Sequence, residues 1–233
     1  MSGLDLQPTK LGNKEHWDDV YKGEIANFEE IGDEGEIWFG VESVEKMVSW
    51  VMENTPPSSD PFVLEVGSGN GTLILALLEK NYLAQNLAGI DYSADAVKLS
   101  KLVAAAKEAD VVTFSACDFL YEDPPHLPHM DPTKTDVWDL LLDKGTYDAI
   151  ALGNKDEQGH SPAIHYPSRA ARLIRPGGFF LITSCNFTEE ELKVNFISEA
   201  TGFKHHSRIQ HPTFTFGGKS GSVCCSVAFQ KAN

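Results

Sequence analysis

Three glycines alternate with other residues in the stretch VLEVGSGNG, residues 63–71. They follow an apolar run that predicts a strand and precede a second apolar run that predicts a helix. Glycine loses more conformational entropy on folding than any other residue, so its repetition needs a reason. We expect Gly67 to permit a sharp turn, Gly69 to let a ligand lie against the backbone, and Gly71 to keep the helix start near the sheet. By itself the loop is also compatible with a plain tight turn.

An acidic residue follows the next predicted strand, 20 residues after the last of these glycines. Asp91 stands where an acid can accept hydrogen bonds from both hydroxyls of a ribose. Its alternative role is to cap the next helix, but Ser93, or Tyr92 with Ser93, is able to do that instead. We therefore assign Asp91, Tyr92 and Ser93 to a cofactor site.

Two further predicted strands also end in an acid, Asp118 and Asp143. Asp118 can accept a hydrogen bond from the exocyclic amine of adenine, with Phe119 against the ring and Cys117 beside it. With Asp91, these acids and the glycine loop predict a nucleoside-type cofactor at the carboxyl ends of the strands.

The charge of the surrounding residues indicates which nucleoside cofactor is expected. A diphosphate prefers a helix N-terminus with little negative charge nearby. Here Glu65 and three aspartates surround the expected site. This favours a ligand without phosphate and with a positive centre, and S-adenosyl-L-methionine fits through its ammonium and sulfonium. A nicotinamide cofactor is less compatible, because the third glycine comes one residue too early for the G-x-G-x-x-G loop.

Alternating strands and helices must position these residues. Predicted strands and helices alternate from residue 61 onward, and the last two strands are expected to form an antiparallel hairpin with a glycine-rich connection. Strands are expected at 62–66, 87–91, 111–117, 137–143, 177–185, 203–209 and 222–230. Helices are expected at 71–80, 93–109, 162–174 and 188–200, the last with a capping box. The pattern predicts an α/β fold with a doubly wound, Rossmann-like sheet.

Before this alternation, residues 1–60 predict a helical cap that forms one structural domain with the core at 61–233. Two stretches with helical spacing, near residues 11–30 and 41–54, support this division. The stretch TPPSSDP ends the second one.

Composition and charge limit the partners. The chain has 233 residues and a formal net charge of −15. An acidic surface repels phosphate backbones, so direct nucleic-acid binding is not expected, whereas a basic protein partner suits the charge. Acidity that only aids solubility is the alternative. The four cysteines predict reduced, buried thiols, and no stretch is apolar enough to span a membrane. We expect a soluble protein that is located in the cytoplasm, and a nuclear location is an open alternative.

Several of these motifs together resemble a known family. VLEVGSGNG, GIDYS, CDF and RPGGFFLI resemble the seven-strand, class I methyltransferases over residues ~60 to 230. LGNKEHWDDVY, GDEGEIWFG, LLDKGTYDAI, LITSCNFTEEEL and FTFGGKSG extend the resemblance to the lysine methyltransferases that modify translation elongation factor 1-alpha. The resemblance implies methyl transfer from S-adenosyl-L-methionine to a lysine amine of that factor.

The resemblance also implies catalytic residues. Asp143 is expected to orient the target amine or the ammonium of the cofactor, with a structural ion pair to Lys144 as the alternative. Tyr147 is expected among the catalytic residues, and Asn186 is expected to line the lysine channel. No metal is expected, because the pairs His126/His129 and His205/His206 lack the cysteine or acid partners of a metal site.

An aromatic lid is expected from the N-terminal cap. Trp38 and Phe39 are expected to cover the methionine end of the cofactor, with Trp17 and Tyr21 beside them, because aromatic faces attract a sulfonium cation. Ordinary core packing is the alternative for these rings. Two alternatives to the function also stay open: a methyltransferase acting on a small molecule or another protein, and a non-catalytic partner subunit that keeps the fold.

Overall fold

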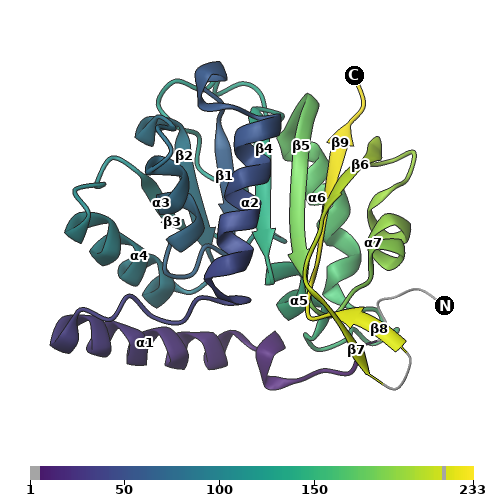
Figure 1. Ribbon diagram of the computed structural model, residues 1–233, viewed down its shortest axis with the longest axis horizontal. Coiled ribbons are helices and arrows are strands. Elements are labelled where there is room, and N and C mark those ends of the chain that lie inside the picture. The colour runs from purple at the N-terminus through teal and green to yellow at the C-terminus, as the bar shows by residue number, and fades with distance from the viewer. Residues whose placement is uncertain (1–5, 217–218) are drawn as a thin grey trace.

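A mixed sheet forms the centre of the molecule (Figure 1). The computed structural model describes residues 6–216 and 219–233. In spatial order the seven strands are β3 (Thr113–Ala116), β2 (Leu87–Asp91), β1 (Val63–Val66), β4 (Trp138–Lys144), β5 (Ile174–Ser184), β9 (Cys225–Lys231) and β6 (Phe203–Ile209). Strands β1 to β5 are parallel, and β9 is antiparallel to β5 and β6. The predicted doubly wound sheet with its antiparallel C-terminal strand pair is confirmed.

Helices cover both faces of this sheet and its carboxyl edge. The described α-helices are α1 (Lys14–Ile31), α2 (Gly40–Asn54), α3 (Thr72–Leu78), α4 (Ala94–Ala106), α5 (Thr146–Ala151), α6 (Tyr166–Leu173) and α7 (Glu189–Phe196). One hydrophobic cluster joins one face of the sheet to α2, α3 and α4, and a second joins the other face to α5, α6 and α7. Figure 1 shows α1 lying across the edge where the parallel strands end.

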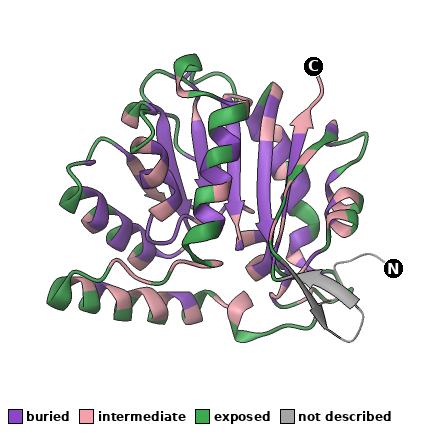
Figure 2. Cartoon of the chain, viewed as in Figure 1, coloured by how far each residue is buried: buried purple, intermediate pink, exposed green. Residues whose placement is uncertain are grey.

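Strand β4 shows how the two clusters arise from alternation along a strand. Leu140 and Leu142 belong to the cluster with α2, α3 and α4, whereas Leu141 belongs to the cluster with α5, α6 and α7. Both faces of the strand are apolar because helices cover both faces of a parallel sheet. Successive side chains point to opposite faces, so Asp143 shares the face of Leu141 and Lys144 shares the face of Leu142. Figure 2 shows the sheet buried throughout its centre, with exposed residues on the outer helix surfaces.

The two helices of residues 1–60 take different places. Helix α2 buries Met47 and Val51 in the layer beside α3, so it covers a sheet face. Helix α1 buries Trp17 and Ile25 and packs mainly against α4. Of these two helices, α1 therefore lies along the edge where the glycine loop and Asp91 are expected to bind a ligand.

Four local features differ from the sequence predictions. Helix α5 was not predicted, and the helix expected at 162–174 is split into the 3-10 turn Pro162–His165 and α6. The connection between β6 and β9 contains an added two-stranded ribbon, β7 (Thr213–Phe216) with β8 (Lys219–Ser222). Gly217 and Gly218, part of the expected glycine-rich connection, lie outside the described residues. Finally, Cys185 is exposed rather than buried.

Candidate active site

A cavity of about 290 Å³ opens at the carboxyl edge of the sheet, and Trp17 and Tyr21 of α1 contribute to its lining. The loops after β1, β2, β3 and β4 supply its walls, together with the N-terminal segment and α5. The expected site residues that line it are Trp17, Trp38, Gly67, Gly69, Asp91, Tyr92, Cys117, Asp118 and Phe119. Residues far apart in the sequence thus meet where a doubly wound sheet places its ligand.

The glycine loop between β1 and α3 requires glycine for two reasons. Gly67 and Gly71 have φ angles of 65° and 80°, in the left-handed region that disfavours other residues. A Cβ on Gly67 would overlap the Thr146 hydroxyl, and a Cβ on Gly71 would lie 2.8 Å from the Phe114 ring. Gly71 therefore lets α3 begin close to the sheet, as expected, whereas Gly67 accommodates a neighbouring side chain as well as the turn.

Gly69 is the loop glycine that faces α1. Its φ is 53°, and a Cβ there would lie 2.7 Å from the Tyr21 hydroxyl, so the loop and α1 almost touch at this point. The Gly69 N–H donates to Asp91 Oδ2 at 3.1 Å. Loop, helix and acid are thus coupled through direct contacts, which no local sequence pattern indicates.

Asp91 lines the cavity at the end of β2, and backbone N–H groups hold its carboxylate. The N–H of Ser93 donates to Oδ1 at 2.9 Å, in addition to the Gly69 bond to Oδ2. The Ser93 hydroxyl caps α4 by accepting from Ala96 N, and Ser93 is buried and does not line the cavity, contrary to its assignment to the cofactor site. Burial raises the pKa of Asp91 to about 6, and the two N–H bonds oppose this rise.

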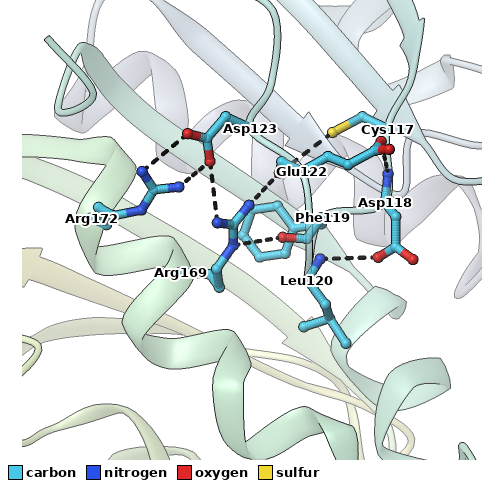
Figure 3. A network of polar contacts seen from close by, with 8 residues as sticks. All are labelled: Cys117, Asp118, Phe119, Leu120, Glu122, Asp123, Arg169 and Arg172. Atoms are coloured by element: carbon cyan, nitrogen blue, oxygen red, sulfur yellow. Dashed lines mark hydrogen bonds and ion pairs between the residues drawn. The ribbon is translucent and has the colours of Figure 1, made fainter.

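A turn after β3 supplies the next wall. Asp118 accepts from Leu120 N at 3.1 Å, and Phe119 is buried with its ring 4.7 Å from that of Tyr166. Figure 3 shows this turn held by arginines from α6. Burial raises the pKa of the Cys117 thiol to about 11, so Cys117 is a protonated packing residue.

Aromatic side chains from α1 and from the segment before α2 form the opposite wall. The Trp17 ring lies 5.0 Å from Trp38 and 6.2 Å from Tyr21, and its Nε1–H donates to Leu11 O at 2.7 Å. Phe39 lies behind this wall, against Gly145, and is not among the cavity-lining residues. The expected lid is therefore assembled from Trp17, Tyr21 and Trp38, without Phe39.

Lys144 is the single cationic side chain along the described lining of the cavity. Its Nζ donates to Trp38 O at 3.3 Å, which ties the aromatic wall to β4. Burial lowers the pKa of Lys144, and the charge of Glu65 opposes this fall. Glu65 is buried on β1 but does not line the cavity, and burial raises its pKa to about 8. The expected contact of Glu65 with the cofactor is therefore not seen in the lining of the cavity.

Asp143 does not reach the cavity, contrary to the expectation of a catalytic and cofactor-binding carboxylate. It is fully buried and faces the α5 and α6 layer. Its two oxygens accept from Thr146 N and Tyr147 N at 3.0 Å, and Oδ2 also accepts from the Tyr166 hydroxyl at 2.5 Å. These bonds start α5, and burial raises the pKa of Asp143 to about 7. The alternative role, a structural ion pair with Lys144, is also absent among the described salt bridges, because the two side chains point to opposite faces of the sheet.

The other expected catalytic residues also lie outside the cavity. Tyr147 is fully buried, with the rings of Phe187 and Phe196 each 5.0 Å away. Asn186 follows β5, where its N–H donates to Ser184 Oγ at 3.2 Å. Neither residue lines the cavity. Tyr147 thus packs in the core, and the expected position of both residues at the cavity is not observed.

Several residues of the lining were not expected from the sequence. Gly12 packs against the Leu152 carbonyl, where a Cβ would overlap, and Thr9 N donates to the same oxygen at 3.0 Å. The LGN stretch thus brings the N-terminal segment onto the end of α5. The remaining unexpected residues include Glu36, Asn70, Leu120, Tyr121, Thr146, Ala149, Ile150, Gly153, Asn154 and Pro162. In the sequence, the only local signal for the contact between Gly12 and Leu152 is a glycine that stands shortly before helix α1.

Among the described residues, no three histidine, cysteine, aspartate or glutamate side chains lie in an arrangement able to hold a metal ion. No helix in the described parts of the chain has the length and apolarity needed to cross a bilayer.

Comparisons with known proteins agree with this geometry. A methyltransferase domain model matches residues 57–218. The protein-lysine N-methyltransferase efm4 of Schizosaccharomyces pombe is 39% identical, covering 99% of this chain and 97% of its own. EEF1A lysine methyltransferase 2 of Mus musculus is 37% identical, covering 97% and 86%. Among solved structures, the cyclase SpnF has a TM-score of 0.64 at 15% identity and covers 100% of this chain and 99% of its own, which shows a shared fold.

The strand order, the domain match and the cavity at the carboxyl edge define a class I methyltransferase fold. Near full-length identity then places the chain more narrowly. It belongs to the family of protein-lysine N-methyltransferases that includes efm4 and EEF1A lysine methyltransferase 2.

Proposed function

We propose that the cavity binds S-adenosyl-L-methionine and that the enzyme transfers its methyl group to a lysine of translation elongation factor 1-alpha. The observation that carries the cofactor is the charge of the lining. Glu36, Asp91 and Asp118 line the cavity, and Lys144 is the single cationic side chain among the described lining residues. A ligand with an ammonium and a sulfonium suits this balance, whereas a diphosphate would meet repulsion from the acids.

The residues present fit the parts of this cofactor. Asp91 would accept from the ribose hydroxyls, because its two N–H bonds fix the carboxylate beside the glycine loop. Asp118 would accept from the adenine amine. Gly69 lets the ligand approach the backbone, and Trp17 and Trp38 present aromatic faces to a cation. When bound, the cofactor supplies an electrophilic methyl group.

The chain's own contribution to transfer is orientation and exclusion of water. A methyl acceptor must approach in line with the leaving sulfur, so holding the two groups together accounts for much of the rate. The target lysine must also be neutral, although free lysine has a pKa near ~10.4. Ala149, Ile150 and Pro162 form an apolar part of the lining, and desolvation there would lower the pKa of the amine.

The protein substrate is inferred from two sources. Relatives named EEF1A lysine methyltransferase 2 share 35–37% identity with this chain. The net charge of −15 also suits a basic partner. Such a substrate would place the enzyme in the cytoplasm, where translation occurs.

The test is methylation of purified elongation factor 1-alpha by the purified enzyme with isotopically labelled S-adenosyl-L-methionine. Mass spectrometry of the digested factor should show one lysine that gains labelled methyl groups. Asp91→Ala should abolish the signal, while Asp110→Ala, on an exposed residue outside the cavity, should retain it. If the wild-type enzyme binds the cofactor but leaves the factor unmodified, the proposed substrate is wrong.

A further inference from the structure

One arginine of α6 connects the core to the turn that follows β3. We call residues 117–123 the β3 turn. It supplies five consecutive residues of the cavity lining, from Cys117 to Tyr121. Its backbone bonds from Tyr121 N and Glu122 N to Asp118 O close the turn, and Cys117 N donates to Asp91 O at 2.9 Å, which ties the first residue of the turn to β2. Beyond Cys117, the described polar contacts that join the turn to the rest of the fold come from side chains about fifty residues later in the chain, as Figure 3 shows.

Arg169 makes most of this attachment with a single guanidinium. Its Nε donates to Phe119 O at 2.8 Å, its Nη2 donates to Glu122 O, and its Nη1 lies 3.1 Å from Asp123 Oδ1. The guanidinium carbon is also 5.8 Å from the Phe119 ring centre. Arg169 does not line the cavity, so any effect on a ligand must pass through the β3 turn.

Arg172, one helical turn further along α6, provides a natural comparison. Its guanidinium contacts the Asp123 carboxylate and none of the carbonyl groups of the β3 turn among the described bonds. Both arginines therefore pair with the same acid, but Arg169 alone also holds the backbone on which Asp118 and Phe119 are mounted.

We propose that Arg169 is a positioning residue that makes the cofactor site selective for adenine over other purines, an inference that rests on the proposed cofactor. The carbonyl oxygens of Phe119 and Glu122, two positions within the β3 turn, accept from one rigid, planar fork. The fork holds the backbone that carries Asp118, which lines the cavity and whose carboxylate also accepts from Leu120 N at 3.1 Å. Lysine keeps the charge and the pairing with Asp123, but its compact ammonium cannot reproduce the fork.

The chemistry of the base makes this selectivity measurable. The exocyclic amine of adenine donates to a carboxylate, whereas hypoxanthine presents a carbonyl oxygen at the same position. A fixed Asp118 accepts from the first and repels the second. A released Asp118 rotates away from either base, so both the affinity and the discrimination fall.

The experiment compares S-adenosylhomocysteine with S-inosylhomocysteine by calorimetry on the full chain. The wild-type enzyme should prefer the adenosyl ligand by at least about tenfold, because a hydrogen bond to a charged acceptor is lost in the other. Arg169→Lys should weaken the adenosyl ligand about tenfold and reduce the preference to within about threefold. It should raise the KM for S-adenosyl-L-methionine and leave kcat at saturating cofactor within about twofold. Arg172→Lys should leave the affinity and the preference unchanged.

Two results would overturn the inference in distinguishable ways. If the wild-type enzyme binds neither ligand, the proposed cofactor fails and the inference fails with it. If the wild-type enzyme binds with the expected preference and Arg169→Lys keeps that preference, the inference alone fails. Should melting curves show that Arg169→Lys does not fold, the same two ligands are compared on Arg169→Gln, whose side chain offers a single neutral amide NH2 group as donor.

Discussion

A single methyl group on Gly69 should weaken cofactor binding through its contact with Tyr21. The Cβ of Gly69→Ala would lie 2.7 Å from the Tyr21 hydroxyl, and the next Tyr21 atoms would be 3.5 and 3.7 Å away. The hydroxyl must retreat by about 0.7 Å to reach ordinary van der Waals contact. Because the other Tyr21 atoms are already far enough, removal of this one oxygen in Tyr21→Phe should relieve the overlap.

The size of the effect has two separable parts. An alanine in the left-handed conformation costs about 1–2 kcal/mol of unfolding free energy wherever it stands. Gly159 isolates this part, because its φ is 82° and a Cβ there meets nothing within 4 Å. The overlap with Tyr21 should add about 1 kcal/mol, within the range of coupling between contacting residues. We therefore expect Gly69→Ala to destabilise about twice as much as Gly159→Ala.

A double-mutant cycle of Gly69→Ala with Tyr21→Phe measures the coupling directly. Urea unfolding gives the stabilities, and calorimetry with S-adenosylhomocysteine gives the affinities. Gly69→Ala should bind at least about tenfold more weakly, and the double variant should recover part of both losses. Equal losses in the double variant and in Gly69→Ala would refute the contact. Normal binding by Gly69→Ala would mean that Gly69 is needed for the turn alone.

Three further predictions follow from the site. Asp143→Ala should lower the free energy of unfolding, measured by urea titration, by about 3–5 kcal/mol, because three donors, Thr146 N, Tyr147 N and the Tyr166 hydroxyl, lose their buried acceptor. Unchanged stability together with lost turnover would instead support a catalytic role for Asp143. Folding raises the pKa of Asp91 from 3.8 to about 6, so protonated Asp91 contributes stability that is complete below pH 3.8 and is lost as pH rises through about 6. Asp91→Asn should therefore flatten the dependence of Tm on pH in this window, and an unaltered slope would contradict the raised pKa. Methylation of elongation factor 1-alpha should weaken as salt rises from 50 to roughly 300 mM, because exposed charges are screened over about 8 Å at physiological ionic strength; a KM for the factor that does not respond to salt would argue against docking by charge.

Local sequence signals determined the backbone of this protein and much of its site. The alternation of apolar runs fixed the order of strands and helices, since parallel strands covered on both faces are apolar throughout. Glycine spacing marked the three left-handed positions after β1. Thr188 and Glu191 form the expected capping box of α7, and Ser93 caps α4. Each of these features depends on residues within a few positions of one another, so a single stretch of sequence can encode it.

Other features were missed because their signals are too short or ambiguous. Helix α5 spans six residues, too few to show a helical period, and it begins at Thr146 because Asp143 accepts its first N–H groups. The DKGT stretch identifies residues of interest but not the direction in which each side chain points. Along a strand that direction alternates, so a shift of one position exchanges the cavity for the core.

Only the tertiary structure decided which acid faces the ligand. Asp91 and Asp143 both stand near the carboxyl ends of parallel strands, β2 and β4, which lie on either side of β1, and both were expected at the site. The Tyr166 hydroxyl, 23 residues away on α6, occupies Asp143, whereas Gly69 and Ser93 hold Asp91 beside the cavity. Contacts between distant segments are set by how layers pack, and packing depends on the shapes of many side chains at once. The sequence therefore determined the backbone and the residue types at the sheet edge, and tertiary packing determined which of those residues can reach a ligand.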